Sequence, residues 1–272
     1  MNTTIKSTGP VRQDRAITVL GGPTAVIDMG GLRIVSDPTF DAAGPQGYLS
    51  KTAGPAAGED AVGPADLVLV SHDTHPDNLD ERGRAFAMSA PLVLTGPLTA
   101  RRLGAPAVGL SPWTGHSLPR PDGAGELTVL AVPAVHGPED AERDADGNVN
   151  CEVTGFVLSG QGLPTVYVSG DNASIRTVVE ISRQVPDIDA AVLHAGAARV
   201  PARFEGRPLS LDGHRAAAAA AVLGADVVVP VHHDGWAHFS EGLPEIERAF
   251  HEAGLSSLLR VAPHGTWTSL VP

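Results

Sequence analysis

Two histidines and three aspartates fall within nine positions of one stretch, Ser71-His72-Asp73-Thr74-His75-Pro76-Asp77-Asn78-Leu79-Asp80. Imidazole nitrogens and carboxylate oxygens are ligands that zinc and its neighbours in the first transition row bind. The stretch follows the apolar run 66–70, which is typical of a buried strand, and Pro76 turns the chain among the polar residues. A metal site at a strand end is therefore one interpretation. A polar loop with helix-capping aspartates is the other, and the motif by itself leaves both open.

Ligand-type side chains also follow three other apolar runs. His136 comes after the strand expected at 127–132, Asp171 after that at 164–169, and His232 after that at 226–231. Gly, Asn, Ser and Pro are the residues that usually follow a strand, so four such ends with His or Asp are unusual. If the strands lie side by side with these ends at one edge, the side chains converge. This pattern predicts a metal site.

The rest of the chain must supply the elements that position these residues. Residues 25–29 and 32–36 predict a hairpin on a Gly30-Gly31 turn, which ends at Asp37. Helices are expected at 81–90, 97–103, 173–184, 212–224 and 244–253. Long loops are expected at 41–64, 104–125 and 137–150. We expect a flexible segment at 1–15 and a single domain at 16–272 of class α/β (α+β), with two sheets flanked by helices.

Composition narrows the function classes. The chain has 272 residues with 42% hydrophobic content and a formal net charge of −12, which argues against nucleic acid and anionic membranes as partners. No apolar stretch approaches the ~20 residues of a membrane span, and the start of the sequence lacks the apolar region of a signal peptide. We expect a soluble, cytoplasmic protein of undetermined oligomeric state. The single cysteine, Cys151, excludes an intramolecular disulfide and is typical of a buried, inert thiol.

The order of these motifs resembles the metallo-β-lactamase superfamily, especially its branch of ascorbate-6-phosphate lactonase-like hydrolases. The matching stretches are Leu67-Val68-Leu69-Val70-Ser71-His72-Asp73, Val132-Pro133-Ala134-Val135-His136, Val168-Ser169-Gly170-Asp171 and Val229-Pro230-Val231-His232. The resemblance covers nearly the whole chain, from about residue 16 to 270. It implies a four-layer αββα sandwich with a metal site, commonly of two zinc ions, at one edge of the sheets.

The resemblance also implies roles for individual residues. His72 and His136 would bind the first metal, Asp171 would bridge the two metals, and Asp77 and His232 would bind the second. A water held by the metals would attack a carbonyl or phosphoryl centre. Asp77 is the candidate catalytic residue, because it would also orient this water or carry its proton.

The chain departs from the family motif, His-x-His-x-Asp-His. Its version, residues 72–78, is one residue longer and ends in Asn78. Either His75 or Thr74 takes the place of the second histidine, and His75 is favoured because a hydroxyl is a poor zinc ligand. Asn78 replaces a ligand of the second metal, and an amide oxygen binds such metals weakly. One or two zinc ions, manganese in place of zinc, and the absence of a metal all stay open.

Six other residues are candidates for supporting roles. Asp37, Asn78 and His194 stand at strand ends or within the motif, where they would orient a metal ligand. His233 and His238 flank Trp236 just after the last expected ligand, where they would contact substrate or shape the pocket wall. For Trp236 itself, packing is favoured over recognition because an indole buries a large apolar area.

We therefore expect a metal-dependent hydrolase of a small soluble substrate, such as a lactone, ester, thioester or phosphate ester. The alternative is a family member with an altered or lost metal site that binds a ligand or catalyses an isomerisation or elimination. Asn78 favours this alternative, whereas His136, Asp171 and His232 oppose it. A nuclease is disfavoured by the acidic charge balance.

Overall fold

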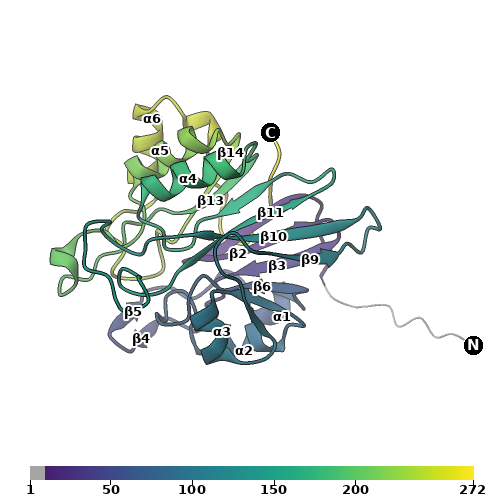
Figure 1. Ribbon diagram of the computed structural model, residues 1–272, viewed down its shortest axis with the longest axis horizontal. Coiled ribbons are helices and arrows are strands. Elements are labelled where there is room, and N and C mark those ends of the chain that lie inside the picture. The colour runs from purple at the N-terminus through teal and green to yellow at the C-terminus, as the bar shows by residue number, and fades with distance from the viewer. Residues whose placement is uncertain (1–9) are drawn as a thin grey trace, which may run out of the picture.

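Two β-sheets face each other, and helices cover the outer face of each sheet (Figure 1). This computed structural model describes residues 10–272 of the chain. One apolar cluster fills the space between the sheets, with Ile27 and Leu69 from one sheet against Phe156 and Val229 from the other. Two further clusters lie between each sheet and its helices. The four-layer αββα sandwich expected from the sequence is thereby confirmed.

The first sheet has the strand order β15-β1-β2-β3-β6-β7-β8. Its strands are β1 (Ala16–Gly21), β2 (Thr24–Met29), β3 (Leu32–Ser36), β6 (Leu67–Leu69), β7 (Val93–Thr95), β8 (Ala107–Gly109) and β15 (Thr268–Ser269). β2 and β3 form the expected hairpin, because Gly30 and Gly31 adopt positive φ angles of 60° and 77° that suit a two-residue turn.

The second sheet has the order β14-β13-β12-β11-β10-β9. Its strands are β9 (Gly115–Pro119), β10 (Glu126–Pro133), β11 (Thr154–Gly160), β12 (Val166–Val168), β13 (Ala190–His194) and β14 (Val227–Val231). The parallel strands β13 and β14 are fully buried and are apolar except for His194 at the end of β13, as expected for strands covered on both faces.

Helices complete the outer layers. They are α1 (Glu59–Val62), α2 (Glu81–Ser89), α3 (Pro97–Leu103), α4 (Ile175–Gln184), α5 (Gly213–Leu223) and α6 (Leu243–Glu252), with short 3-10 turns at Phe204–Gly206 and Ser256–Leu258. α1, α2 and α3 lie with the first sheet, and α4, α5 and α6 with the second (Figure 1). Asp212 caps α5 by accepting a hydrogen bond from the Arg215 N–H, as its position in the sequence predicts.

Strand direction brings the candidate ligands to one edge. β3, β6 and β7 are parallel in the first sheet, and β12, β13 and β14 are parallel in the second. β10 runs in the same direction as β12, because each is antiparallel to β11. The carboxyl ends of β3, β6, β10, β12, β13 and β14 are therefore where Asp37, His72, His136, Asp171, His194 and His232 stand.

Two of the expected loops contain regular structure. Residues 41–64 include α1 and a small hairpin of β4 (Gly44–Gln46) and β5 (Leu49–Lys51), and residues 104–125 include β8 and β9. The prediction of structureless loops there was wrong, since these short elements are half exposed and carry no apolar periodicity.

The expected flexible segment 1–15 lies mostly outside the described residues. Within its described part, Arg12 forms an ion pair with Asp66, with 2.7 Å between guanidinium and carboxylate. Among the helices of residues 10–272, none combines the length and apolar character that crossing a bilayer requires.

A buried ion pair ties the loop region to α2. The Asp80 carboxylate lies 2.9 Å from the Lys51 ammonium and also accepts the N–H groups of Phe40 and Gly83, at 2.9 and 2.8 Å. Both charged side chains are at most 3% exposed. Loss of one partner would leave an uncompensated buried charge.

We predict that Asp80→Ala lowers the free energy of unfolding by about 3–5 kcal/mol. The matched control is Arg82→Ala, which breaks the exposed pair with Glu59 and should cost less than about 1 kcal/mol. Urea unfolding of both variants measures the difference. Equal losses would contradict the role of the buried pair.

Candidate metal centre

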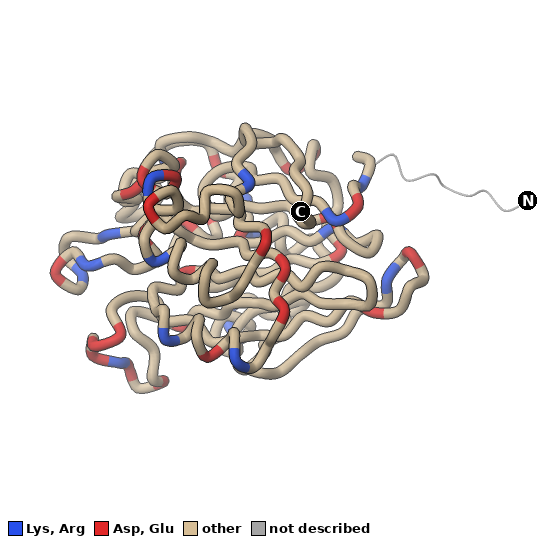
Figure 2. The backbone as a smooth tube through the Cα atoms, turned by 90° about the horizontal axis from the view of Figure 1, so that it is seen from above, with Lys and Arg blue, Asp and Glu red and all other residues tan. Residues whose placement is uncertain are grey.

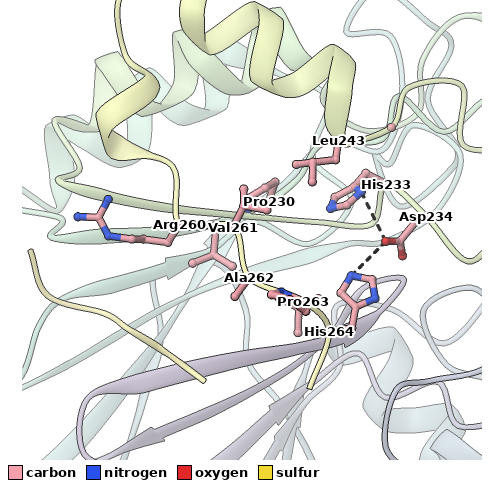
Figure 3. A pocket seen from close by; sticks show the side chains of 12 residues that line it. Pro230, His233, Asp234, Leu243, Arg260, Val261, Ala262, Pro263 and His264 are labelled. Carbon is pink, nitrogen blue, oxygen red and sulfur yellow. Dashed lines mark ion pairs between the residues drawn. The ribbon is translucent and has the colours of Figure 1, made fainter. Parts of the chain in front are cut away.

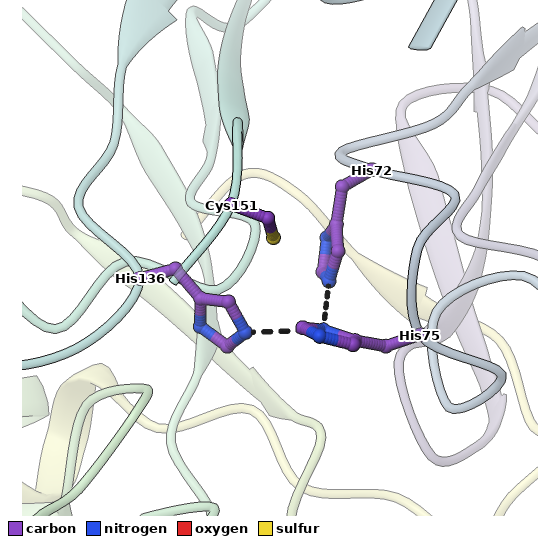
Figure 4. Close-up of side chains that lie close together, drawn as sticks. All are labelled: His72, His75, His136 and Cys151. Atoms are coloured by element: carbon purple, nitrogen blue, oxygen red, sulfur yellow. Dashed lines mark hydrogen bonds between the residues drawn. The ribbon is translucent and has the colours of Figure 1, made fainter. Parts of the chain in front are cut away.

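Three imidazole rings converge at the edge of the sandwich. The His75 Nδ1 lies 2.8 Å from the His72 Nε2 and 3.2 Å from the His136 Nε2. Ligands around a zinc ion with bonds of about 2.0–2.1 Å stand roughly 3.3 Å apart, so this spacing fits one ion. His75, rather than Thr74, thus lies with the other two histidines. Figure 4 shows the three rings facing one another.

Contacts outside the group fix these rings. The His136 Nδ1 lies 2.8 Å from the Leu209 carbonyl oxygen and donates to it, which leaves the Nε2 lone pair facing the other histidines. The His72 Nδ1 lies 3.0 Å from the Ser71 hydroxyl. Asp73 turns away from the group and pairs with Arg84 and Arg102.

Burial keeps two of the rings neutral. Burial, together with the neighbouring His136, lowers the pKa of His75 to about 4. Burial also holds the pKa of His72 well below its ordinary value, with a further contribution from His75. Neutral imidazoles offer the lone pairs that a metal ion requires.

A second group combines two carboxylates with imidazoles. The Asp77 Oδ2 lies 3.2 Å from the His232 Nε2 and 2.9 Å from the His238 Nε2. The Asp171 Oδ1 lies 2.8 Å from the His194 Nδ1 and 3.3 Å from the His232 Nε2. Asp77, Asp171 and His232 are thus brought together, as the strand ends predict.

These carboxylates stay ionised although they are buried. Burial alone would raise the pKa of Asp77, but the hydrogen bonds with His232 and His238 outweigh it and hold the pKa well below its ordinary value. Burial also acts to raise the pKa of Asp171, and His232 and His194 together lower it. Both groups are therefore anionic at neutral pH.

Unpaired buried atoms show that the group fits a cation. The Asp77 Oδ1 and the Asp171 Oδ2 have no hydrogen-bond partner within residues 10–272. A buried carboxylate oxygen without a donor is costly, and a bound divalent ion would satisfy both atoms. The carboxylate and imidazole donors are the types that zinc and manganese bind.

The supporting residues lie next to this group. Asp37 accepts a hydrogen bond from the Ser71 N–H at 2.6 Å, and its other oxygen is 3.7 Å from the His194 Nε2. Burial raises the pKa of Asp37 to about 7 despite the contacts with Ser71. Asn78 is fully buried and points its amide toward Asp171, with 3.4 Å between the Asn78 Nδ2 and the Asp171 Oδ1.

Backbone strain accompanies two of the site residues. Asp37 and His232 have positive φ angles of 41° and 59°, a conformation that side-chain-bearing residues rarely adopt. Gly196 allows the turn at His232, because a Cβ at position 196 would come within 2.0 Å of the His232 carbonyl oxygen. The fold therefore holds His232 in place at a conformational cost.

Two predicted residues lie away from both groups. His233 faces Asp234 in a separate, larger cavity of about 530 Å³ behind β14, where Asp234 also pairs with His264 (Figure 3). Trp236 is 3% exposed and packs near Lys51, which fits the packing interpretation. Of the two, Trp236 comes nearer to the metal-ligand residues, because its ring lies edge-on to the His238 ring with 6.3 Å between the ring centroids.

Three side chains near the groups carried no clear signal in the sequence. Tyr48 and Arg203 line the small cavity of about 30 Å³ above His75, Asp77 and His238. Both come from irregular segments, where the sequence gives no register. Burial raises the pKa of Tyr48 to about 12, so its phenol is neutral.

The third is Cys151, whose sulfur lies beside the three histidines. The residue as a whole is partly exposed, whereas its sulfur is buried, as expected from the sequence. Burial of its sulfur raises the pKa of the thiol to about 12.

Comparison with protein families identifies the scaffold. Residues 32–233 match the family model described as the beta-lactamase superfamily domain. The chain belongs to this superfamily. The match runs from β3 to just past β14, and it includes His72, His75, His136, Asp77, Asp171 and His232 but not His238.

Relatives and solved structures agree with this superfamily assignment. The chain is 32% identical over 196 residues to a UPF0173 metal-dependent hydrolase of Methanosphaerula palustris. The aligned region covers 69% of this chain and 75% of the relative. A second UPF0173 metal-dependent hydrolase, from Methanocorpusculum labreanum, is 27% identical over 68% of this chain and 75% of its own length. The chain is thus an enzyme related to metal-dependent hydrolases. The lactonase-like branch expected from the sequence stays a prediction.

Two solved structures share the fold at low sequence identity. The isothiocyanate hydrolase from Delia radicum gut bacteria superposes with a TM-score of 0.77 at 19% identity, over 93% of this chain and 98% of its own. A possible metal-dependent hydrolase from Veillonella parvula superposes with a TM-score of 0.79 at 14% identity, over 94% and 100%. At these identities the superfamily fold is what is shared.

The low pKa of His75 predicts an acid-sensitive fold for the metal-free protein. As the pH falls below 6.5, the unfolded chain takes up a proton on His75, whereas the folded protein does so only near pH 4. Stability is therefore lost as the pH falls through this window, by up to about 1.4 kcal/mol per pH unit.

We predict that His75→Gln flattens this dependence. The loss of stability between pH 7.5 and pH 5, measured by urea unfolding with a chelator present, should be smaller by about 2 kcal/mol than in the wild type. His214→Gln, at an exposed position, is the control and should leave the dependence unchanged. An unchanged slope in His75→Gln would contradict the buried neutral imidazole.

Proposed function

We propose that the chain is a metal-dependent hydrolase of small soluble substrates, such as lactones, esters, thioesters or phosphate esters. The observation that carries this proposal is that His72, His75 and His136 converge at one point, next to a small cavity that the ionised Asp77 and Asp171 line. Relatives at 27–32% identity are metal-dependent hydrolases, which supports the same reaction class.

Two groups of residues would hold the metal. The first comprises His72, His75 and His136. The second comprises Asp77, Asp171, His232 and His238. Zinc, with manganese as the second candidate, would lower the pKa of a water molecule and polarise the scissile carbonyl or phosphoryl group.

His238 compensates for the departure of the motif at Asn78. In the family motif, the residue at the place of Asn78 is a histidine that binds the second metal. Here His238 brings an imidazole within 2.9 Å of Asp77 from the segment after β14. The second group therefore has two imidazoles, His232 and His238, besides its two carboxylates.

Asp77 is the residue best placed to handle a proton. Its Oδ2 is engaged by His232 and His238, and its Oδ1 has no partner within residues 10–272. Asp77 also lines the small cavity. The same carboxylate would therefore bind the metal through one oxygen and use the other to accept the proton of a nucleophilic water and pass it to the leaving group.

Other residues of the chain fix this arrangement. The His194 Nδ1 donates a hydrogen bond to Asp171, and the His194 Nε2 on the other side of the ring faces the Asp37 carboxylate. Asp37, His194 and Asp171 thus form one chain of contacts. The Leu209 carbonyl sets the tautomer of His136. Such contacts keep ligands oriented and their removal weakens metal binding about 10–100-fold.

The cavity and the charge distribution favour a small substrate. The cavity of about 30 Å³ admits only a few atoms, and Tyr48 and Arg203 border it. In Figure 2, basic residues are interspersed with acidic ones along the surface turns. With a net charge of −12, this distribution offers no footprint for nucleic acid. A cytoplasmic location remains part of the proposal.

A non-hydrolytic reaction is the alternative, and Asn78 is the observation that favours it. If His238 did not serve the second metal, this group would retain only one imidazole. An isomerase or eliminase with a single metal would then fit the residues. Metal stoichiometry separates the two proposals.

We predict that the wild type binds about two equivalents of zinc or manganese. Elemental analysis of protein purified without chelator gives the count, and His136→Ala and His238→Ala should each lose about one equivalent. His214→Ala is the matched control and should keep both. Binding of one equivalent that is insensitive to His238→Ala would favour the alternative. An absence of metal after reconstitution would refute the hydrolase.

We further predict that Asp77→Asn lowers kcat/KM at least about hundredfold. The assay uses a panel of lactones, carboxylic esters, thioesters and phosphate monoesters with the metal-loaded protein. Metal content is measured on the same samples, because Asp77 is also a proposed ligand. Undiminished turnover in Asp77→Asn would show that Asp77 has no catalytic role.

A further inference from the structure

The sulfur of Cys151 lies among metal-ligand nitrogens. One ligand atom each from Cys151, His72, His75 and His136 forms a group in which all four atoms lie within 4.8 Å of one another. In Figure 4 the thiol points toward the space that the three imidazole rings enclose. His72 and His136 are 0% and 2% exposed, so the group is largely shielded from water.

We propose that Cys151 is the fourth protein ligand of the three-histidine metal site. This inference rests on the proposed function, because it assumes that the histidines bind a metal. Imidazole nitrogen and thiolate sulfur are donor types that zinc binds, and four protein ligands are the usual number at a closed zinc site. On binding, the thiol S–H bond breaks, its proton passes to solvent, and the thiolate sulfur bonds to the metal without any change of oxidation state.

Contacts with α3 and with the core fix the segment that carries this thiol. Val149 is 1% exposed and anchors the segment on one side of Cys151. Glu152 holds it on the other side, because its carboxylate accepts the Leu98 N–H and the Thr99 N–H at the start of α3, at 2.9 and 3.0 Å. Asn150 between them has a positive φ of 63°.

One further bond couples the thiol segment to the histidine motif. The Thr154 N–H donates to the Ser71 carbonyl oxygen at 3.0 Å, next to His72. The residues on either side of Cys151 are thus fixed to α3 and to the end of β6. A thiol held this firmly needs little reorganisation to bind a metal.

A thiolate ligand would set the metal preference of this site. Sulfur donors favour zinc and cobalt over manganese and magnesium, which prefer oxygen. The group of Asp77 and Asp171 is richer in oxygen. The two metal positions are therefore expected to differ, with the softer ion at Cys151.

Cobalt(II) substitution tests the proposal. Because Cys151 is the only cysteine of the chain, any thiolate-to-cobalt charge-transfer band in the near ultraviolet must arise from it. We expect this band to appear in the metal-free wild type as cobalt(II) is titrated in without oxygen. Cys151→Ser should lose the band and keep the visible cobalt bands of the histidine site. Its zinc affinity, from competition with a chromophoric chelator, should fall at least about tenfold.

The outcomes separate this proposal from the proposed function. Cobalt binding by the wild type without the charge-transfer band would overturn the role of Cys151 alone. A wild type that binds no cobalt or zinc would overturn the proposed function as well. Cys151→Ala, checked for folding by circular dichroism, is the second variant. If Cys151→Ser failed to fold, loss of the band in folded Cys151→Ala would support the proposal, and an unchanged zinc affinity there would overturn it.

Discussion

The structure depends on neighbouring imidazole groups that compensate the negative charge of two buried carboxylates. Asp77 and Asp171 are at most 3% exposed, and burial of an anion is costly unless donors or cations surround it. His232 contacts both, His194 contacts Asp171, and His238 contacts Asp77. These histidines come from strand ends and turns of the second sheet, whereas Asp77 follows a strand of the first. The compensation therefore joins the two halves of the sandwich at the site.

Sheet topology provides the positions that this compensation requires. Parallel strands in both sheets end at one edge, and the local turns at Asp37 and His232 have left-handed backbone that the surrounding packing sustains. The rings are then oriented by groups outside the site, such as the Leu209 carbonyl for His136. Rigid scaffolding of this kind is what a metal centre needs, since ligand geometry decides which ion binds.

We propose that residues far away in the sequence compensate for the departures from the family motif. Asn78 lacks the imidazole that the motif would supply, and His238 stands 161 positions from the Asp77 that it contacts. Cys151 approaches the three-histidine group from the segment before β11. The two centres are thus proposed to differ in chemistry, with sulfur at one and oxygen at the other. A sequence motif with a missing ligand therefore does not by itself imply a lost site.

The sequence by itself determined the strands that lead to the ligand residues, the hairpin at Gly30-Gly31 and the placement of His72, His136, Asp171 and His232 at strand ends. These features follow from local apolar patterns and turn residues, which act over a few positions. Tertiary structure alone decided that His75 lies with His72, that His238 contacts Asp77 while His233 turns to Asp234, and that Cys151 faces the histidines. The physical reason is that these contacts join irregular segments through packing of distant strands and helices, and no local periodicity encodes such register.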